Sequence, residues 1–246
     1  FLKTILDLSE RFNPDEFIFC WDSVSSYRKV GYPEYKAHRR KGMTEEELFV
    51  REVAYRQFTE LKDTILPRIG FENVFCQEGF EADDLIAKIV IDQPKNSSYI
   101  IVSSDNDLYQ LLPLIKSMYF MDKKKLFSHN EFEEQYDISP TDWVKVKAIA
   151  GDMTDNLPGV PGIGPKTAIK YVKGKDIGSR LLNLITEYEP TIAMNKRLMS
   201  LPHPRTKTME IKKSEFKLEE FESVCLENGF SSFLRKEILN KWKSNF

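Results

Sequence analysis

The order of hydrophobic and polar residues predicts strands alternating with helices over the first 140 residues. Apolar positions recur at helical spacing in the segments at 1–12, 45–66 and 82–91, and another helix begins at 108–112. Short apolar runs predict strands at 16–21, 73–76, 98–102, 117–120 and 125–127. Strands that alternate with helices indicate an α/β domain with a mainly parallel sheet flanked by helices.

The pattern changes after Pro140, where strand-like runs become scarce. Helical spacing continues at 141–150, 166–172, 177–188 and 218–242. A loop dense in glycine and proline separates the first two of these helices. We therefore expect a sheet-containing domain at 1–140 and a helical region at 141–246. The polar segment at 23–42 contains Gly31 and Pro33 and is predicted to begin as a loop.

The composition is that of a folded globular protein, with 41% hydrophobic and 30% charged residues among 246. Because the sequence has no run of 18 apolar residues, no membrane-spanning helix is predicted. Cys20, Cys76 and Cys225 are widely spaced and form no CxxC pair. This spacing is typical of reduced thiols in a cytoplasmic protein rather than of disulfides or a zinc site.

Eight acidic residues lie in four short motifs at the junctions of predicted elements. They are Asp22, Glu81, Asp83, Asp84, Asp105, Asp107, Asp152 and Asp155. Each motif alone also fits a structural role, as a turn, a cap or a charge that complements a helix dipole. However, Asp22 and Asp105 directly follow predicted strands, and the carboxyl ends of parallel strands share one edge of a sheet. We therefore expect these carboxylates to converge.

Converging carboxylates repel one another unless cations neutralise them. Hard oxygen ligands select Mg²⁺ or Mn²⁺, and two such ions suit the hydrolysis of a phosphodiester. The chain has a net charge of −2 but would carry +6 without the eight acids. An acidic pocket in an otherwise basic chain favours metal-dependent action on a polyanion.

A glycine-rich stretch, GDMTDNLPGVPGIGPKTAIKYV, lies between two predicted helices. It contains Gly159, Gly162 and Gly164, and Lys166 opens the second helix. The stretch matches neither the Walker pattern nor the dinucleotide fingerprint. Glycines and helix N-terminal amides between two helices favour sequence-independent contact with a DNA backbone. The alternative is a tight turn with incidental glycines.

The segment at 25–41 has a net charge of +5, with Glu34 as its one acid. Its cations are Arg28, Lys29, Lys36, Arg39, Arg40 and Lys41, interleaved with Tyr27, Tyr32 and Tyr35. Basic groups mixed with aromatics are typical of single-stranded nucleic acid binding, with Arg28, Tyr35 and Arg40 as candidate DNA-binding residues. The alternative is a solvated basic loop.

Together these motifs resemble the 5′-nuclease (flap endonuclease) family, which includes the 5′→3′ exonuclease domain of bacterial DNA polymerase I. The matching segments are WDS, YRKVGYPEYKAHRR, GFEADDLIA, VSSDNDLYQLL and GDMTDNLPGVPGIGPKTA, in family order over residues 21–168. The resemblance implies a PIN-like domain with a helical arch at about 25–60 and a helix–three-turn–helix motif at about 141–173. A family strand bearing another metal-binding Asp precedes this point, so we expect it to be missing from the sequence.

The resemblance also implies a role for each motif. Asp22, Glu81, Asp83 and Asp105 would bind one metal ion, joined by Asp84 and Asp107, while Asp152 and Asp155 would bind a second. Lys36 and Arg39 would be the catalytic cations on the scissile phosphate, and Tyr35 would stack on a base. The loop at 159–164 would contact duplex phosphates, in the family often with a K⁺ ion held by backbone carbonyls.

The implied activity is metal-assisted hydrolysis of DNA that leaves 5′-phosphates, as a 5′→3′ exonuclease and flap endonuclease. The implied substrate is a 5′-flapped or 5′-tailed duplex, including RNA-primed DNA, cut by a monomer in the cytoplasm of a bacterium or a phage-infected cell. Two alternatives remain, a non-catalytic flap-binding protein and a PIN-type ribonuclease. The eight acids count against the first, and the glycine-rich loop counts against the second.

Overall fold

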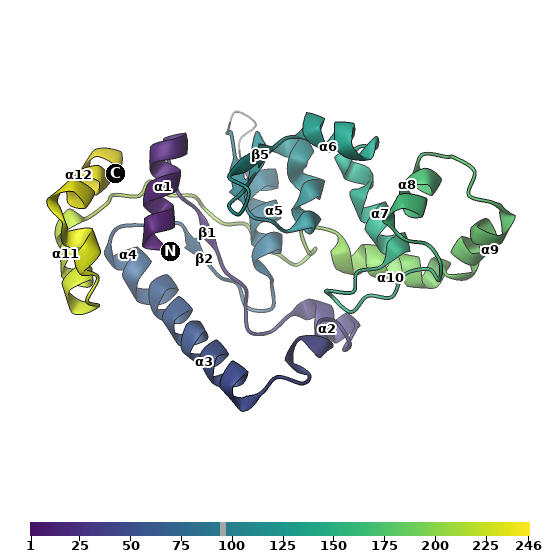
Figure 1. Ribbon diagram of the computed structural model, residues 1–246, viewed down its shortest axis with the longest axis horizontal. Coiled ribbons are helices and arrows are strands. Elements are labelled where there is room, and N and C mark those ends of the chain that lie inside the picture. The colour runs from purple at the N-terminus through teal and green to yellow at the C-terminus, as the bar shows by residue number, and fades with distance from the viewer. Residues whose placement is uncertain (94–96) are drawn as a thin grey trace. The chain divides into compact units, whose positions relative to one another are not determined.

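A computed structural model describes residues 1–93 and 97–246, with the side chain of Arg40 excepted (Figure 1). The chain divides into two compact units. The first comprises Phe1–Trp21, Gly42–Phe75 and Glu210–Phe246, and the second comprises Asp22–Lys41 and Cys76–Met209.

Helices dominate the first unit. Helix α1 is Leu2–Phe12, and α3 is Glu45–Glu60, which continues through a π-helical turn at Leu61–Ile65 into α4, Leu66–Arg68. Thr44 begins α3 with a capping box, since its hydroxyl accepts from Glu47 N–H at 3.2 Å and Glu47 accepts from Thr44 N–H at 2.8 Å. The helices expected at 1–12 and 45–66 are therefore confirmed.

The C-terminal part of the first unit is not the single helix expected at 218–242. It consists of α11 (Leu218–Glu227), a 3₁₀ turn (Ser231–Leu234) and α12 (Lys236–Asn245). The break falls at Gly229, whose φ of 68° lies in the left-handed region that glycine adopts at little cost. Strand β1 (Phe19–Cys20) pairs in parallel with β2 (Val74–Phe75), and both strands are shorter than expected. Buried side chains that include Ile5, Leu66, Phe221 and Trp242 form the core of this unit.

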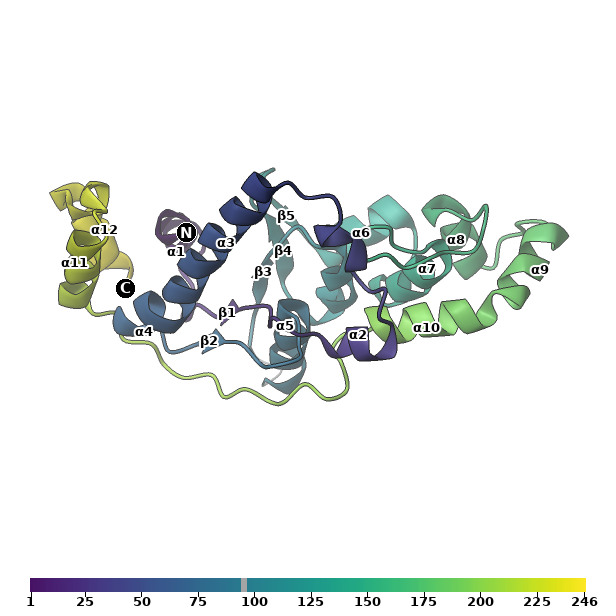
Figure 2. The same ribbon diagram turned by 90° about the horizontal axis from the view of Figure 1, so that it is seen from below.

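A three-stranded sheet lies in the second unit. Strand β3 (Ile100–Val102) runs parallel to β4 (Ser117–Phe120), which is antiparallel to β5 (Lys125–Phe127), as Figure 2 shows. Helix α5 (Ala82–Asp92) precedes β3, and a 3₁₀ helix (Asn106–Leu114) follows it. Helix α6 is His129–Tyr136 and had not been predicted, although Ser128 and Glu131 form a capping box at its start.

Further helices complete the second unit. They are α2 (Tyr27–Gly31), α7 (Trp143–Ala150), α8 (Pro165–Val172), α9 (Ser179–Glu187) and α10 (Glu189–Met199). The segment at 23–42 begins as a loop, as expected, and then contains α2 and a 3₁₀ turn at Ala37–Arg40. Helix α10 had not been predicted. Helix α7 packs against both α8 and α10. Asn195 of α10 is fully buried and donates to Ala148 O at 3.0 Å and Pro158 O at 2.8 Å.

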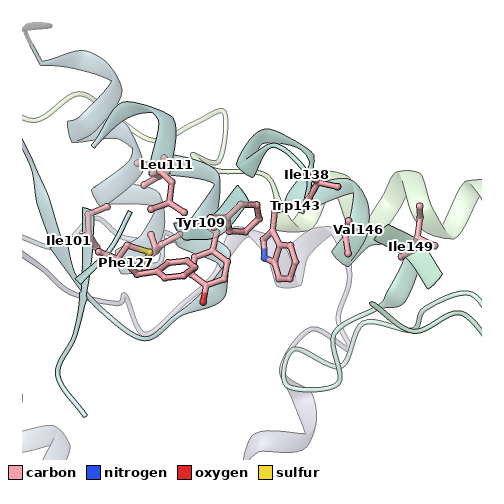
Figure 3. Close-up of a cluster of buried hydrophobic side chains, with 14 of the residues drawn as sticks. Ile101, Tyr109, Leu111, Phe127, Ile138, Trp143, Val146 and Ile149 are labelled. Atoms are coloured by element: carbon pink, nitrogen blue, oxygen red, sulfur yellow. The ribbon is translucent and has the colours of Figure 1, made fainter. Parts of the chain in front are cut away.

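The core of the second unit joins the sheet to its helices (Figure 3). Ile101 and Phe127 come from strands, Tyr109 from the 3₁₀ helix, and Trp143 and Val146 from α7. The rings of Phe132 and Trp143 pack edge to face, with an interplanar angle of 90° and a distance of 5.6 Å between their centroids. This core fixes the start of α7 through Trp143.

The α/β class with a small, mainly parallel sheet is confirmed, since β1–β2 and β3–β4 are both parallel pairs. The domain boundary near residue 140 stays a prediction. Among the described residues, the structure contains no helix that is long and apolar enough to cross a bilayer.

Candidate metal centre

Three carboxylates converge in the second unit. Asp107 lies in the 3₁₀ helix after β3, and Asp152 and Asp155 lie in the loop after α7. One oxygen from each lies within 4.8 Å of the others, which suits a shared cation. The loop is held in place by two backbone hydrogen bonds between Asp152 and Leu157, at 2.9 and 2.8 Å.

Lys147 of α7 completes this group, and the sequence reasoning had missed it. Its ammonium contacts Asp107 and lies 2.6 Å from Asp152 Oδ2. One signal in the sequence could have revealed it. Lys147 follows Val144 by three residues and Trp143 by four, so it falls on the apolar stripe of its own helix. Because a lysine is rarely buried unless it is paired, a lysine on such a stripe predicts an acidic partner.

The three carboxyl groups differ in pKa. Burial raises the pKa of Asp107 to about 6, although the charge of Lys147 lowers it. Burial also raises the pKa of Asp155, against the opposing effect of Lys36. Asp152 is different, because hydrogen bonds from Lys147 and Thr154 outweigh burial and lower its pKa to about 2. Burial therefore disfavours the charged forms of Asp107 and Asp155, and a bound cation would offset this cost.

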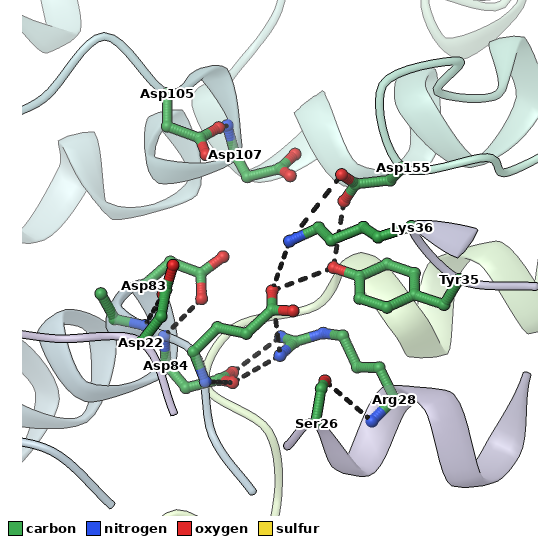
Figure 4. A network of polar contacts seen from close by, with 12 residues as sticks. Asp22, Ser26, Arg28, Tyr35, Lys36, Asp83, Asp84, Asp105, Asp107 and Asp155 are labelled. Atoms are coloured by element: carbon green, nitrogen blue, oxygen red, sulfur yellow. Dashed lines mark hydrogen bonds and ion pairs between the residues drawn. The ribbon is translucent and has the colours of Figure 1, made fainter. Parts of the chain in front are cut away.

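A second group of polar side chains contacts Glu81, which precedes α5. Its members Tyr35 and Lys36 are labelled in Figure 4. The hydroxyl of Tyr35 lies 3.0 Å from both Glu81 Oε2 and Asp155 Oδ2. Lys36 Nζ donates to the same Glu81 oxygen at 2.7 Å and lies 3.8 Å from Asp155 Oδ1. Tyr35 and Lys36 therefore connect Glu81 to Asp155.

The local backbone explains how Lys36 reaches this position. Its φ of 54° is left-handed, which is uncommon for a side chain of this size, and its N–H donates to Asp155 O at 2.9 Å. Burial opposes the charge of Lys36, but Glu81 and Asp155 outweigh it and raise the pKa, so this side chain stays an ammonium. Burial, together with the same two acids, raises the pKa of Tyr35, which stays protonated.

Arg39 lies at the exposed side of the centre. Its guanidinium donates to Asp155 Oδ1 at 2.9 Å, and 48% of its side chain is exposed. Arg39 can therefore face a ligand and Asp155 together. The side chain of Arg40, an expected DNA contact, lies outside the described residues.

The remaining predicted acids lie at the ends of elements. Asp22 Oδ1 accepts from Ala82 N–H at 2.8 Å, which joins it to the first turn of α5. Asp105 Oδ1 accepts from Asp107 N–H at 2.9 Å and caps the 3₁₀ helix. Burial raises the pKa of Asp83 to about 8, because the neighbouring acids Glu81 and Asp84 add to burial against Arg28. These positions are shown together in Figure 4.

Two residues expected to touch DNA are buried instead. Tyr35 is 2% exposed, so its ring is not available to stack on a base, and its hydroxyl contacts acids. Arg28 is 4% exposed and pairs with Asp84 through both terminal nitrogens, one of them at 2.7 Å from Asp84 Oδ1. The expectation of surface contacts from these two side chains is therefore corrected. Their basic and aromatic character reflects contacts within the second unit.

The glycine-rich loop joins α7 to α8. An added Cβ at Gly159 would lie 2.0 Å from Ala150 O, so this glycine allows a close backbone approach. Gly162 has a φ of 78°, and neither it nor Gly164 has a neighbour within 4 Å of a built Cβ. Lys166 is exposed in the first turn of α8. The loop therefore presents open backbone and a cation.

The donor set suits a hard divalent cation. Asp107, Asp152 and Asp155 offer carboxylate oxygens alone, and hard oxygen ligands of this kind are the ones that Mg²⁺ prefers. Among the described residues, no histidine or cysteine joins this cluster. Two of its carboxyl groups have raised pKa values, which a bound cation would relieve.

Two family models match almost the whole chain. A 5′-3′ exonuclease N-terminal resolvase-like domain matches residues 1–137, and a 5′-3′ exonuclease C-terminal SAM fold matches residues 138–222. The chain belongs to the 5′-3′ exonuclease family. The resemblance stated from the motifs is therefore confirmed.

Relatives of this exonuclease-family chain agree with that assignment. A 5′-3′ exonuclease of Bacillus subtilis (strain 168) is 32% identical over 187 residues, which cover 74% of this chain and 60% of that protein. A DNA polymerase I of Rhizobium leguminosarum is 36% identical over 166 residues, which cover 67% of this chain and 15% of that protein. The chain spans 60% and 61% of the first two curated exonucleases that it matches.

Solved structures show the same fold. The T5 5′-exonuclease with bound zinc aligns with a TM-score of 0.69 at 22% identity, covering 99% of this chain and 88% of that one. A T5 D15 flap endonuclease in complex with DNA and metal ions aligns with a TM-score of 0.70 at 21% identity, covering 99% and 87%. At this identity the likeness is one of fold.

Proposed function

We propose that this exonuclease-family chain is a divalent-metal-dependent nuclease that hydrolyses DNA phosphodiesters, acting as a 5′→3′ exonuclease and flap endonuclease. The observation that carries the proposal is the convergence of Asp107, Asp152 and Asp155, with ligand oxygens within 4.8 Å of one another, beside the cations Lys36 and Arg39. Metal-assisted phosphodiester hydrolysis requires acids that hold metal ions, and it is helped by cations that neutralise charge on the phosphate.

The residues divide the work as follows. Asp107, Asp152 and Asp155 would hold Mg²⁺ or Mn²⁺, and Glu81, Asp83, Asp22 and Asp105 are the proposed holders of a further ion. Bound metal would supply an activated water and neutralise developing charge on the phosphate. Arg39 orients the scissile phosphate from the exposed side. Lys36, held by Glu81, donates to a non-bridging oxygen as its charge grows.

The glycine-rich loop is the proposed contact to the duplex part of the substrate. Gly162 and Gly164 are open to approach, and Lys166 adds a charge at the start of α8. The family resemblance extends this proposal to a K⁺ ion held by backbone carbonyls of the loop. It also leads us to propose a 5′-flapped, 5′-tailed or RNA-primed duplex as substrate, a monomeric enzyme, and a cytoplasmic location.

Cleavage of a 5′-labelled flap duplex tests the proposal. We expect cuts near the single-strand junction with Mg²⁺ and none with EDTA. The part of the cut strand that stays in the duplex should carry a new 5′-phosphate. Asp155→Asn should abolish cleavage but keep DNA binding, while Asp142→Asn, an acid that pairs with Lys145 outside the centre, should cleave normally. Flap binding without cleavage by the unaltered chain would contradict the nuclease assignment and favour a binding protein. Equal cleavage of single-stranded RNA would favour a ribonuclease.

A further inference from the structure

Arg28 has no part of its guanidinium directed to solvent. Nε donates to Leu198 O at 2.6 Å, and both terminal nitrogens donate to the two oxygens of Asp84. The side chain is 3% exposed. A phosphate could reach this guanidinium only after the pair had opened, at the cost of leaving Asp84 as an uncompensated buried charge.

Asp84 is equally committed to the protein. Its Oδ1 accepts from Arg28 and from His203 N–H at 2.7 Å, and its Oδ2 accepts from Arg28 and from Glu81 N–H at 3.3 Å. The residue is fully buried. A carboxylate offers about four acceptor positions, and here four donors use them. A metal ion would have to displace one of these donors to bind Asp84 directly.

The four donors come from three parts of the second unit. Arg28 of α2 supplies two of them, and its Nε also donates to the carbonyl of Leu198 in the last turn of α10. His203, which supplies the third, lies a few residues after α10. Glu81 is the residue that precedes α5, and its backbone N–H is fixed by Asp84. The Arg28–Asp84 pair therefore joins α2, the end of α10 and the start of α5.

The same pair also acts on the side chain of Glu81. Arg28 lies 3.8 Å from Glu81 Oε2, the oxygen that also contacts Tyr35 at 3.0 Å and Lys36 at 2.7 Å. The pair thus fixes the backbone of Glu81 through Asp84 and attracts its carboxylate through Arg28. Groups that hold a metal ligand in this way affect metal affinity without touching the metal.

We propose that Arg28 and Asp84 form a buried positioning pair that orients Glu81 at the metal centre, and that neither residue contacts DNA or metal itself. This inference rests on the proposed nuclease function for its catalytic consequence. Its effect on metal binding can be measured in the absence of cleavage.

A double-variant cycle tests the pair. Arg28→Lys keeps the charge but loses the two-pronged contact, and Asp84→Asn keeps the shape but loses the charge. We expect each single variant to weaken Mn²⁺ binding and lower kcat on a flap duplex by about tenfold, the scale of a lost outer-sphere partner. KM for the flap should stay within about twofold. The Mn²⁺ affinity and kcat of the double variant should be no lower than those of the more impaired single variant.

DNA binding in EDTA gives the second readout. With Arg28→Lys we expect the flap affinity and its salt dependence to match the unaltered chain. The control is Lys29→Ala, which removes an exposed cation from the same helix and should reduce the slope of affinity against salt by about one. If Arg28→Lys weakens flap binding, Arg28 contacts DNA and the proposal is wrong.

Metal binding separates the remaining outcomes. Loss of Mn²⁺ affinity in Asp84→Asn, with none in Arg28→Lys, would make Asp84 a ligand and overturn the pair. Additive losses in the double variant would also overturn it. If the unaltered chain binds Mn²⁺ but does not cleave, the proposed function fails, while the Mn²⁺ cycle still decides the positioning role. Should Asp84→Asn not fold by circular dichroism, an unchanged Mn²⁺ affinity in Arg28→Lys overturns the proposal by itself.

Discussion

Lys147 lies 2.6 Å from Asp152, and this contact places a partly buried ammonium beside the three-carboxylate centre. The same ammonium contacts Asp107. Burial opposes the charge of Lys147, but the two acids outweigh it and raise its pKa. Lys147 therefore remains charged at neutral pH and keeps both carboxylates ionised and ready for a metal ion.

Replacing Lys147 by Met should move the acidic limb of the cleavage profile to higher pH. The charge of Lys147 lowers the pKa of both Asp107 and Asp152, so its removal raises both. We expect cleavage at pH 7 to fall by about 10- to 100-fold, with partial recovery at pH 8.5. The control is Lys145→Met, which removes an exposed lysine from the same helix. Profiles that coincide for the two variants would show that Lys147 does not tune the acids.

The pKa of Asp83 predicts how stability changes with pH in the metal-free protein. Burial raises this pKa from 3.8 to about 8. Between these two values the folded chain holds a proton that the unfolded chain has lost, so stability falls as the pH rises through this window. With EDTA present, we expect the melting temperature to drop by roughly 5 °C between pH 6 and pH 8.5. Mg²⁺ should reduce the drop, since it favours the ionised acids.

Two variants check that Asp83 causes this slope. Asp83→Asn cannot ionise, so its melting temperature should change much less over the same range. Asp142→Asn alters an acid outside the centre and should melt with the slope of the unaltered chain. A slope that persists in Asp83→Asn would assign the effect to another group.

The hydroxyl of Tyr35 should matter more for cleavage than for folding. It lies between Glu81 and Asp155, at 3.0 Å from each, inside a buried ring pocket. Tyr35→Phe keeps the ring and should cost about 1 kcal/mol of unfolding free energy, the scale of one hydrogen bond. We expect kcat to fall several-fold with KM unchanged.

A larger truncation separates the ring from the hydroxyl. Tyr35→Ala also leaves a cavity and should cost about 3–5 kcal/mol in urea unfolding. Tyr188→Phe removes a hydroxyl elsewhere in the second unit and serves as the control. If Tyr35→Phe raises KM while kcat holds, the hydroxyl contributes to substrate binding and not to the chemical step.

The acids of the centre could be found from the sequence because each follows a recognisable boundary. Asp105 lies three residues after the end of β3, and Asp152 follows the glycine that ends α7. Periodicity also predicted α1, α3 and α5. In these segments the apolar spacing and the capping residues agree, so local and tertiary preferences point the same way.

The burial and partners of the cations in the basic segment at 25–41 could not be predicted in this way. Its cations suggested one solvated, DNA-facing surface, but Arg28 is buried against Asp84 and Lys36 contacts Glu81. These partners lie 56 and 45 residues away in sequence, and no local pattern encodes a pairing over that distance. Lys29, Arg39 and Lys41 have the expected exposure. Which cation pairs inside and which faces outward is decided by tertiary contacts alone.

The glycines of the loop between α7 and α8 should separate a folding role from a binding role. A Cβ at Gly159 would lie 2.0 Å from Ala150 O, a backbone atom that cannot move cheaply, whereas Gly164 has a φ of −90° and open space around it. Gly159→Ala should therefore lower the melting temperature by several degrees, consistent with about 1–3 kcal/mol for overpacking. Gly164→Ala should melt like the unaltered chain but bind duplex DNA more weakly, because the added methyl group lies where a phosphate would approach the backbone.

Thermal melts and duplex titrations in EDTA measure the two effects. The control is Gly174→Ala, because Gly174 has open space around it and a φ of 68°, so this variant tests backbone strain alone. If Gly164→Ala binds duplex DNA as tightly as the unaltered chain, this end of the loop does not contact the backbone of the substrate.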